Sequence, residues 1–467
     1  MQKELKINQN WLTRRTGDPF ADTGGMVIQT LMKEWETTDI LKLIEDTAKL
    51  YVNNWGGKLN AFFLNSKITQ PAFQGPRKIT ETLSYYKGLL EETLPFEKGA
   101  CRILGEQTKL FPAGRDNHIM SGSGTFINFH HAFQGGVMLS KEALIRVFFV
   151  PLGCVQLSDK IAILDSNNDE LLEYFVRENV RENLRRISTK IGEGVLRSEF
   201  KNPSSALFEF AQNWIREAKD SDEVEHSELN LYHFTNFGAS PEIILYNFSA
   251  ALFQFYADLQ YRTTQKDWRR FTNAYFRQKN AAYNYEADTF EIKEKNEVQV
   301  INHNSYKNWY NKIYEKLLKG DAIHWEMLNW VRNERRPLNF EIVKLYQKLL
   351  RNMNEKTLQI IERIADYVLQ DSNNLKKKLS RLHKAGKSYE FKRALFKIFQ
   401  DNHVNKNSAP LFTLQEYVHE LFPETSYWQE TKILLLIAIY QKMHEQKIWL
   451  DDEDIAELVE EAVEEEN

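Results

Sequence analysis

Residue types that carry out catalysis are present in this sequence, but their spacing fits no common catalytic motif. There is no G-x-x-x-x-G-K-[ST] phosphate loop, G-x-G-x-x-G dinucleotide turn, H-E-x-x-H zinc motif or G-x-S-x-G nucleophile elbow. The glycine-rich run Ser121–Gly124 lacks the lysine of a phosphate loop. Asp116 and Asp159 are isolated, whereas a metal-dependent nuclease needs clustered carboxylates. We therefore expect a protein that is not an enzyme.

Potential metal ligands are also widely spaced. The two cysteines, Cys101 and Cys154, are single, whereas zinc sites usually have closely spaced pairs such as C-x-x-C. His130 and His131 are adjacent, and adjacent residues of a strand point to opposite faces. Together with His118 these side chains could assemble a site, but the spacing favours buried cysteines and loop histidines. We expect no metal and no other cofactor.

Two cationic stretches are candidates for contact with a polyanion. The first is Arg262–Lys279, where aromatic residues alternate with the cations and Asp267 is the single acid. Cations pair with phosphates and rings stack on bases, so this mixture is typical of nucleic-acid binding. The alternative is an amphipathic helix whose rings pack inward. The cations are Arg262, Lys266, Arg269, Arg270, Arg277 and Lys279.

The second cationic stretch is Lys376–Arg393, where Glu390 is the single acid and aromatic residues are few. Like charges at this density repel one another, so the pattern favours a polyanionic partner over a merely solvated helix face. It indicates contact with a nucleic-acid backbone, independent of sequence. The cations are Lys376, Lys377, Lys378, Arg381, Lys384, Lys387, Lys392 and Arg393.

The net charge of −4 conceals this basic character. The segment Asp451–Asn467 carries ten acids and no base, and the other residues hold 61 lysines and arginines against 55 acids. The body of the protein is therefore mildly basic, at +6. The distribution of charge along the chain is a better indicator of a nucleic-acid partner than the net charge.

The pattern of apolar residues and glycines predicts an α+β protein with two domains. Residues 1–320 are expected to form an irregular mixed α/β domain with long loops, and residues 321–467 an all-α helical bundle. Strands are predicted at Ile145–Val150, Ile161–Leu164 and Leu229–Phe237. Helices are predicted at Thr38–Val52, Leu171–Ile187, Ser204–Ala218 and Pro241–Tyr261, and at Phe340–Met353, Leu358–Leu369, Tyr389–Gln400, Thr413–Leu421 and Ser426–Glu445.

Sequence features also predict a cytoplasmic protein. The longest apolar run, Ile433–Tyr440, is too short to span a membrane, and the first residues lack the apolar stretch of a signal peptide. Two distant cysteines are typical of a reducing compartment. No membrane partner is expected.

The stretch Trp11–Gly25 contains T-G-D-P-F-A-D-T-G, which resembles the opening T-G-D-P-F-x-D-x-G of the Cst-type large subunits of the type I-B CRISPR surveillance complex, Cascade. Asn128-Phe129, the Val150–Cys154 segment and the helical C-terminal third follow in a similar order. Many family members carry two C-x-x-C pairs, which this chain lacks, so no zinc site is transferred. The motif residues are Thr16, Gly17, Asp18, Pro19, Phe20, Asp22 and Gly24.

The resemblance implies a non-cutting subunit of a ribonucleoprotein complex in antiviral defence or transposon targeting. Such a subunit lies at the 5′ end of the guide RNA, recognises a short flanking motif (PAM) on target double-stranded DNA and supports R-loop formation. The guide supplies sequence specificity through base pairing. The implied partners are the CRISPR guide RNA, target DNA, other Cascade subunits, and a recruited helicase-nuclease or transposition proteins.

Polar residues in glycine-rich loops are the candidates for contact with the PAM or the guide end. Amides present both donors and acceptors to base edges, and cations suit guanine edges or phosphates. The alternative is that these are ordinary turn residues. The candidates are Asn53, Asn54, Lys58, Asn60, Arg115, Asn117 and Asn128.

The same motif has a simpler structural interpretation. Asp18-Pro19 and Gly24-Gly25 are turn signals, and Asp22 is expected to accept hydrogen bonds from nearby backbone N–H groups. Two other functions stay open: a metal-dependent nucleic-acid enzyme, and a scaffold subunit that binds only proteins.

Overall fold

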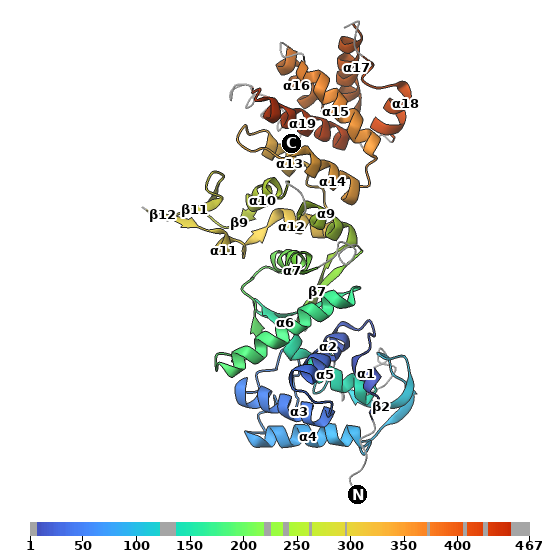
Figure 1. The fold of residues 1–467 in the computed structure, drawn as a ribbon, viewed down its shortest axis with the longest axis vertical. Helices are drawn as coiled ribbons and strands as arrows, with labels where there is room; N and C mark the ends of the chain where they lie inside the picture. Colours follow the sequence, from blue (N-terminus) through green and yellow to red (C-terminus); the bar gives the residue numbers. More distant parts are fainter. Residues whose placement is uncertain are drawn as a thin grey trace. The chain divides into compact units, whose positions relative to one another are not determined.

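A computed structural model describes residues 7–121, 137–218, 226–236, 242–260, 264–294, 297–370, 374–404, 409–423 and 428–449. The fold is α+β, as predicted, and it contains two compact units (Figure 1). Unit 1 comprises 1–219 with 227–249, and unit 2 comprises 220–226 with 250–467. The division thus falls at 249/250 and differs from the predicted boundary at 320/321. Helices that precede residue 320 pack with helices that follow it, which places them in one unit.

The centre of unit 1 is a layer of three packed helices. α2 (Pro19–Glu34) lies against α5 (Lys141–Gly153) and α6 (Asp169–Ser188), and the short α1 (Gln9–Thr13) contacts α2 and α5 (Figure 1). α5 occupies the place of the strand predicted at Ile145–Val150, so that prediction is wrong. Every residue of α5 is buried, including Lys141, Glu142 and Arg146, so its apolar residues lack the 3.6-residue period that marks an amphipathic helix.

A second helical pair and a small sheet complete one side of unit 1. α3 (Ile40–Lys49), which confirms the predicted helix there, continues into the π-helical turn η1 (Leu50–Asn54) and packs along α4 (Pro76–Leu90) (Figure 1). The sheet is antiparallel and has three strands in the order β1-β2-β3. Their bounds are β1 (Glu97–Ala100), β2 (Gln107–Ala113) and β3 (Val137–Leu139).

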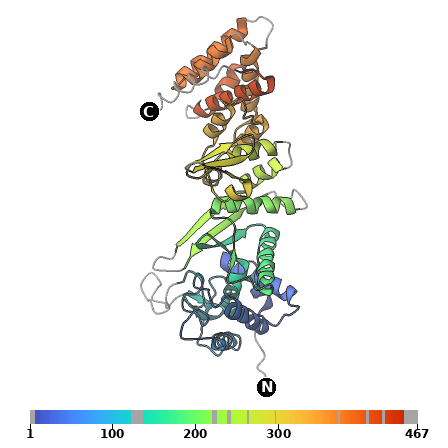
Figure 2. The ribbon, with the colours of Figure 1, turned by 90° about the vertical axis from the view of Figure 1, so that its left-hand side faces the viewer.

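A five-stranded sheet in the order β6-β4-β5-β7-β8 forms the other part of unit 1. α7 (Pro203–Glu217) packs against its last two strands (Figure 2). The strand predicted at Ile161–Leu164 lies within β5, the strand predicted at Leu229–Phe237 is confirmed over β7, and the helices predicted at α6 and α7 are confirmed. The strand bounds are β4 (Val155–Leu157), β5 (Lys160–Ser166), β6 (Leu196–Arg197), β7 (Leu229–Thr235) and β8 (Glu242–Phe248).

The helix predicted at Pro241–Tyr261 is wrong in its first half. β8 pairs with β7 over seven residues, and the helix α9 (Ala250–Gln260) begins only after Ser249. The segment Glu242–Phe248 is rich in isoleucine, leucine and aromatic side chains, which are compatible with either a helix or a strand. Hydrogen bonds to β7 favour the strand.

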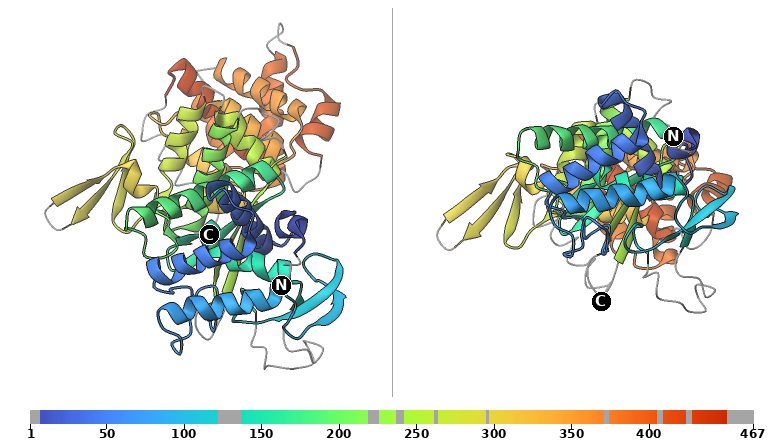
Figure 3. Two further views of the ribbon diagram at one scale, coloured as in Figure 1. Left: turned by 60° about the horizontal axis from the view of Figure 1, so that its bottom comes forward. Right: turned by 90° about the horizontal axis from the view of Figure 1, so that it is seen from below.

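Unit 2 begins with α9 and α10 (Gln265–Asn273), followed by two small antiparallel sheets. The three-stranded sheet β10-β11-β12 extends from the helices of unit 2 (Figure 3). Rings from Phe276, Phe290 and Tyr306 form a small core beside it. The remaining bounds are β9 (Phe276–Arg277), β10 (Ala281–Asn284), β11 (Thr289–Glu294), β12 (Glu297–Ile301), α11 (His303–Tyr306), β13 (Tyr310–Asn311) and α12 (Lys312–Lys319).

The part of residues 321–467 that the structure describes is helical, as predicted. α19 (Trp428–Gln446) is its centre and contacts α13, α14, α15, α16 and α17. α9 packs against α14, which ties the segment before residue 320 to the bundle. The bounds are α13 (His324–Val331), α14 (Phe340–Leu350), α15 (Glu355–Gln370), α16 (Leu375–His383), α17 (Ser388–Val404), α18 (Leu414–Glu416) and the π-helical η4 (Tyr417–Leu421).

Among the helices of the described residues, none has the length and apolar character that crossing a membrane requires.

Candidate nucleic-acid interface

The family-like motif forms the start of α2 and its junction with α5. Asp18 is the N-cap of α2 and accepts a hydrogen bond from the Ala21 N–H, and Pro19 occupies the first turn. The Asp22 carboxylate accepts hydrogen bonds from the backbone N–H groups of Thr16 and Gly17, as the sequence predicted. Gly24-Gly25, predicted as a turn, instead lies inside α2.

Asp22 also pairs with Arg146 of α5, and both side chains are fully buried. Arg146 donates further hydrogen bonds to the backbone oxygens of Trp11, Arg14 and Ala21. Burial lowers the pKa of Arg146, and the charges of Asp22 and Asp18 oppose that shift. The motif residues Asp18, Asp22 and Gly24 are therefore used in packing α2 on α5.

Asn117, a candidate for PAM contact, is buried and committed to the fold. Its side-chain amide donates to the Tyr85 hydroxyl at 2.6 Å and to the Pro112 oxygen at 3.1 Å, and its oxygen accepts from the Gly114 N–H at 2.8 Å. These bonds use both amide hydrogens, so no donor remains for a base edge.

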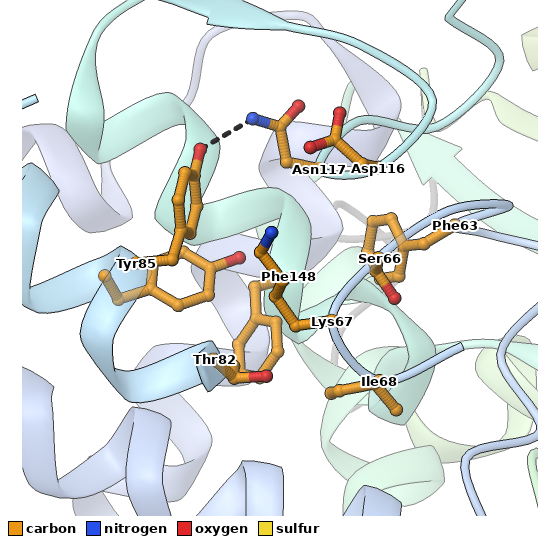
Figure 4. Close-up of a pocket in the computed structure, with 10 residues that line it drawn as sticks. Phe63, Ser66, Lys67, Ile68, Thr82, Tyr85, Asp116, Asn117 and Phe148 are labelled. Carbon is orange, nitrogen blue, oxygen red and sulfur yellow. Dashed lines mark hydrogen bonds between the residues drawn. The ribbon is translucent and has the colours of Figure 1, made fainter. Parts of the chain in front are cut away.

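The small pocket beside Asn117 is shown in Figure 4. Lys67 reaches into it between the aromatic residues and Asp116. Its volume of about 30 Å³ suits a water molecule rather than a nucleobase. The lining residues are Phe63, Ser66, Lys67, Ile68, Thr82, Tyr85, Tyr86, Asp116, Asn117 and Phe148.

The other loop candidates are divided between separate places. Asn53 and Asn54 are exposed at the end of η1, and Lys58 and Asn60 are exposed in the turn that follows. The Arg115 oxygen accepts a hydrogen bond from the Leu64 N–H, which holds the loop after β2 beside the segment 63–68. Asn128 lies outside the described residues.

Neither cysteine is positioned to bind a metal ion. Both are buried: the Cys101 sulfur accepts from the Ser140 N–H, and the Cys154 thiol donates to the Val150 oxygen. Burial raises the pKa of Cys154 well above its usual value. Within the described ranges, no group of three histidine, cysteine or acidic side chains could hold a metal ion.

The first cationic stretch mainly has the alternative structure predicted for it, in which the aromatic rings pack inward. Trp268, Phe271 and Phe276 are buried, so their rings are not available to bases. Arg270 lies over the Tyr285 ring at 4.9 Å and Arg277 over the Tyr275 ring at 5.2 Å. Lys266, Arg269 and Lys279 are exposed, and Arg262 lies outside the described residues.

The second cationic stretch forms α16, a turn and the start of α17, and it borders a surface hollow of about 690 Å³. We call this hollow the cationic hollow. Four of its lining residues are cations and one, Glu390, is an acid. The lining residues are Arg381, Lys384, Ala385, Glu390, Arg393, Ala394, Phe396, Lys397 and Gln400.

Helical spacing explains why the cations gather there. Phe391, Ala394, Leu395 and Ile398 bury one face of α17. Arg393, Lys397 and Gln400 follow one another at i, i+4 and i+7, so they lie along a single face of the same helix. On α16, Leu375, Leu379 and Leu382 are buried, while Lys384 is exposed just after the helix ends.

Backbone contacts fix the turn between α16 and α17. The Lys432 ammonium of α19 donates to the oxygens of His383 and Ala385, both at 2.9 Å. Glu390 accepts hydrogen bonds from the N–H groups of Gly386 and Lys387. A hydrogen bond from Tyr389, followed by these backbone bonds, lowers the pKa of Glu390, so its charge is already engaged within the turn.

Two arginines of the cationic hollow are available to a ligand. Within the described residues, neither Arg381 nor Arg393 makes a hydrogen bond or an ion pair. Lys397 forms an i,i+4 ion pair with Asp401 at 3.4 Å, which is weak at the surface. Phe396, which is 50% exposed, adds a ring to the rim.

One residue of the second stretch is not part of this surface. Lys378 is only 2% exposed, and its ammonium lies over the Tyr367 ring at 4.7 Å. The prediction that Lys378 contacts a nucleic-acid backbone is therefore wrong. It occupies a packed position of α16 next to Leu379, and a run of three lysines on a helix cannot point to one face.

Sequence reasoning missed Phe396, Lys397 and Gln400, which follow Arg393 at helical spacing. Extending the pattern by one helical turn would have included them.

Comparison with protein-family models, curated proteins and solved structures finds no match to this chain.

Proposed function

We propose that this chain is a non-catalytic nucleic-acid-binding subunit, of the large-subunit class of type I-B Cascade. In this proposal it binds the guide RNA, other Cascade subunits and target DNA, and it helps to open the duplex next to a PAM. A helicase-nuclease or transposition proteins are then recruited by the assembled complex. A cytoplasmic location belongs to the same proposal. The resemblance at Thr16–Gly24 supports the family assignment.

The cationic hollow is the observation that supports nucleic-acid binding. Arg381 and Arg393 are guanidinium groups without a protein acceptor among the described residues, which makes them the strongest candidates to pair with phosphates. The row Arg393, Lys397 and Gln400 advances along α17 by about 5.4 Å per helical turn. A cationic row of this kind follows an extended phosphate backbone without selecting a base sequence.

Phe396 favours a single strand over a duplex. Its half-exposed ring lies among the cations, and it packs on the Tyr417 ring with centroids 5.8 Å apart, which limits its motion. Unpaired bases expose a face on which such a ring stacks, whereas duplex bases do not. Opening of a target duplex generates a displaced single strand, so the proposed role supplies a ligand of this kind.

The test is co-expression of the tagged full-length chain with its neighbouring genes and a CRISPR array. Co-purified RNA is sequenced, and binding of target DNA with and without the flanking motif is measured. The proposal expects a guide RNA, partner subunits and motif-dependent binding that requires this chain. Purification of the chain alone, free of RNA at several salt concentrations, would contradict the family assignment. Cleavage of labelled DNA by the purified chain with magnesium or manganese would contradict the non-enzyme assignment.

A further inference from the structure

Unit 1 contains a second polar hollow, separate from the small pocket beside Asn117. It has a volume of about 310 Å³, at the lower limit of pockets that bind small ligands. Its lining comes from the turn after η1, from β4 and β5, from the end of α6 and from the loop leading into β6. We call it the unit 1 hollow.

Three cations from separate segments line the unit 1 hollow. They are Lys58 in the turn, Arg186 near the end of α6 and Arg197 on β6. Within the part of the chain that the structure describes, Lys58 and Arg197 have no side-chain hydrogen bond or ion pair. Arg186 has a single distant contact, at 4.0 Å from Glu182.

Arg186 is also largely available to a ligand, because Glu182 is already engaged. The Glu182 carboxylate accepts two hydrogen bonds from Arg185, both at 2.7 Å. Hydrogen bonding from Arg185 lowers the pKa of Glu182, which shows that the favoured partner of this carboxylate is Arg185. Three cations without a strong internal partner therefore share one hollow.

The backbone around Lys58 is held firmly. Gly57 has a positive φ of 73°, and a Cβ there would lie 2.9 Å from the Ile68 oxygen. The Gly57 N–H donates to the Tyr51 oxygen and the Lys58 N–H to the Trp55 oxygen. Tyr51 and Trp55 are buried, so the turn that carries Lys58 is anchored in the core of unit 1.

Arg197 is placed by sheet pairing. β6 runs parallel to β4, with Arg197 opposite Gln156, and the Ser198 N–H donates to the Gln156 oxygen at 2.8 Å. The end of α6 is fixed in turn, because the N–H groups of Ile191 and Gly192 both donate to the Arg186 oxygen. The cations thus stand on three supported backbone segments, and the site is largely pre-formed.

The rest of the lining is suited to more than a bare anion. Asp159 and Glu193 supply carboxylate acceptors, and Phe62 and Ile191 supply apolar surface. Ile191 is 57% exposed, so it can cover the face of a ring. A nucleotide needs the same three kinds of contact. Its phosphate pairs with cations, its N–H and O–H groups donate to acceptors, and its base packs on apolar surface.

We propose that the unit 1 hollow binds a single nucleotide through its phosphate monoester. Lys58, Arg186 and Arg197 contact the phosphate, and Asp159 and Glu193 accept hydrogen bonds from the ribose or the base. The ligand is either a free mononucleotide or the 5′-phosphorylated end of a strand. This site shares no residue with the cationic hollow, so it does not depend on the proposed function.

Isothermal titration calorimetry of the full-length protein at low salt tests this site. AMP, adenosine and inorganic phosphate are compared, followed by a tetranucleotide with a 5′-phosphate or a 5′-hydroxyl. We expect AMP to bind at least about tenfold more tightly than adenosine or phosphate. Lys58→Ala and Arg197→Ala should each weaken binding of AMP by about tenfold, since each removes one charge-assisted contact.

The controls separate this site from other cations. Lys42→Ala and Arg77→Ala remove exposed cations of unit 1 that do not line the hollow, and they should leave the affinity unchanged. Lys58→Arg retains the charge and should restore most of the binding. Circular dichroism and thermal unfolding of each variant establish that it is folded.

The two ligand sources are distinguished by the tetranucleotide. Tighter binding of its 5′-phosphorylated form than of AMP identifies a strand end, and equal or weaker binding identifies a free nucleotide. The proposal is overturned if neither AMP nor the phosphorylated strand binds at about 1 mM. It is also overturned if Lys58→Ala and Arg197→Ala bind normally, if phosphate binds as tightly as AMP, or if Arg381→Ala with Arg393→Ala abolishes the binding instead.

Discussion

Asp22 and Arg146 form a 2.6 Å ion pair in which neither side chain is exposed to solvent. The pair joins α2 to α5, and three further guanidinium hydrogens are donated to the backbone oxygens of Trp11, Arg14 and Ala21. The motif that resembles a protein family therefore also holds α2 against α5 in unit 1.

Removing one member of this pair leaves a buried charge without compensation. We predict that Asp22→Ala lowers the free energy of unfolding of unit 1 by about 3–5 kcal/mol. Urea unfolding followed by circular dichroism measures the change. The matched control, Glu182→Ala, breaks the exposed pair with Arg185 and should cost less than about 1 kcal/mol. Equal effects of the two variants would show that burial of the first pair is unimportant.

The close approach of α2 and α5 depends on Gly24. A Cβ at this position would lie 2.0 Å from the Arg146 backbone oxygen, which cannot move without displacing α5. We predict that Gly24→Ala destabilises unit 1 by about 3 kcal/mol or more. In Gly88→Ala on α4, the new Cβ meets the flexible Leu94 side chain at 3.1 Å, and the stability should change by no more than about 1 kcal/mol. Thermal and urea unfolding compare them, and a stable Gly24→Ala protein would refute the close packing.

His383 makes the stability of unit 2 depend on pH. Burial, followed by the charges of Arg332 and Lys432, lowers its pKa to about 3. One ring nitrogen lies 3.3 Å from the Arg332 guanidinium, which can only donate, and the other lies 3.0 Å from the Tyr440 hydroxyl. The native histidine therefore stays neutral at pH values where the unfolded one, with a pKa of about 6.5, takes up a proton.

Because protons then favour the unfolded chain, the stability contribution of His383 is complete above pH 6.5 and is lost as the pH falls toward 3. We predict a loss of about 2 kcal/mol between pH 7 and pH 5 from this residue. Urea unfolding at several pH values measures it. His383→Gln should have a smaller loss over the same interval, and an unchanged pH dependence would contradict the prediction.

Phe396 tests whether the cationic hollow prefers a single strand. We predict that Phe396→Ala weakens binding of single-stranded DNA by about fivefold, at the low end of base–ring stacking, and leaves duplex binding unchanged. Fluorescence anisotropy with both ligands measures this. Trp325→Ala removes another exposed ring of unit 2 that does not line the hollow, and it should have no effect. An equal loss for both ligands in Phe396→Ala would exclude stacking.

Parts of the fold could be predicted because local pattern and final environment agree. α3, α6, α7 and α15 have one buried face, so their apolar residues recur with a helical period. The role of Asp22 as an acceptor for nearby N–H groups also followed from its residue type. In these cases a short window of sequence contains the information that decides the structure.

Other parts depend on contacts far along the chain. α5 is buried on all sides, so Ile145–Val150 has the composition of a strand, and β8 is a strand because β7 pairs with it. The role of Arg146 was not predicted, because it lies in a mainly apolar run and its partner Asp22 is 124 residues away in the sequence. The unit 1 hollow likewise unites Lys58 with Arg197 only after folding.

The candidate site was predicted in part. The charge of the second stretch identified Arg381, Lys384 and Arg393, which do line the cationic hollow. Charge alone does not reveal which cation faces the core, so Lys378 was included wrongly. The rings of the first stretch have the composition of a stacking surface, but they bury apolar area in unit 2 instead.

Binding of nucleic acid through the cationic hollow is tested by the salt dependence of the affinity. Fluorescence anisotropy of single-stranded DNA compares the full-length protein with the double variant Arg381→Ala, Arg393→Ala and with a control double variant, Lys42→Ala, Arg77→Ala. We predict at least about tenfold weaker binding by the first variant only. For this variant, the slope of log K against log salt should be smaller in magnitude by about 1.4, as expected for two lost phosphate contacts. An unchanged affinity and an unchanged slope would show that this hollow does not bind the DNA.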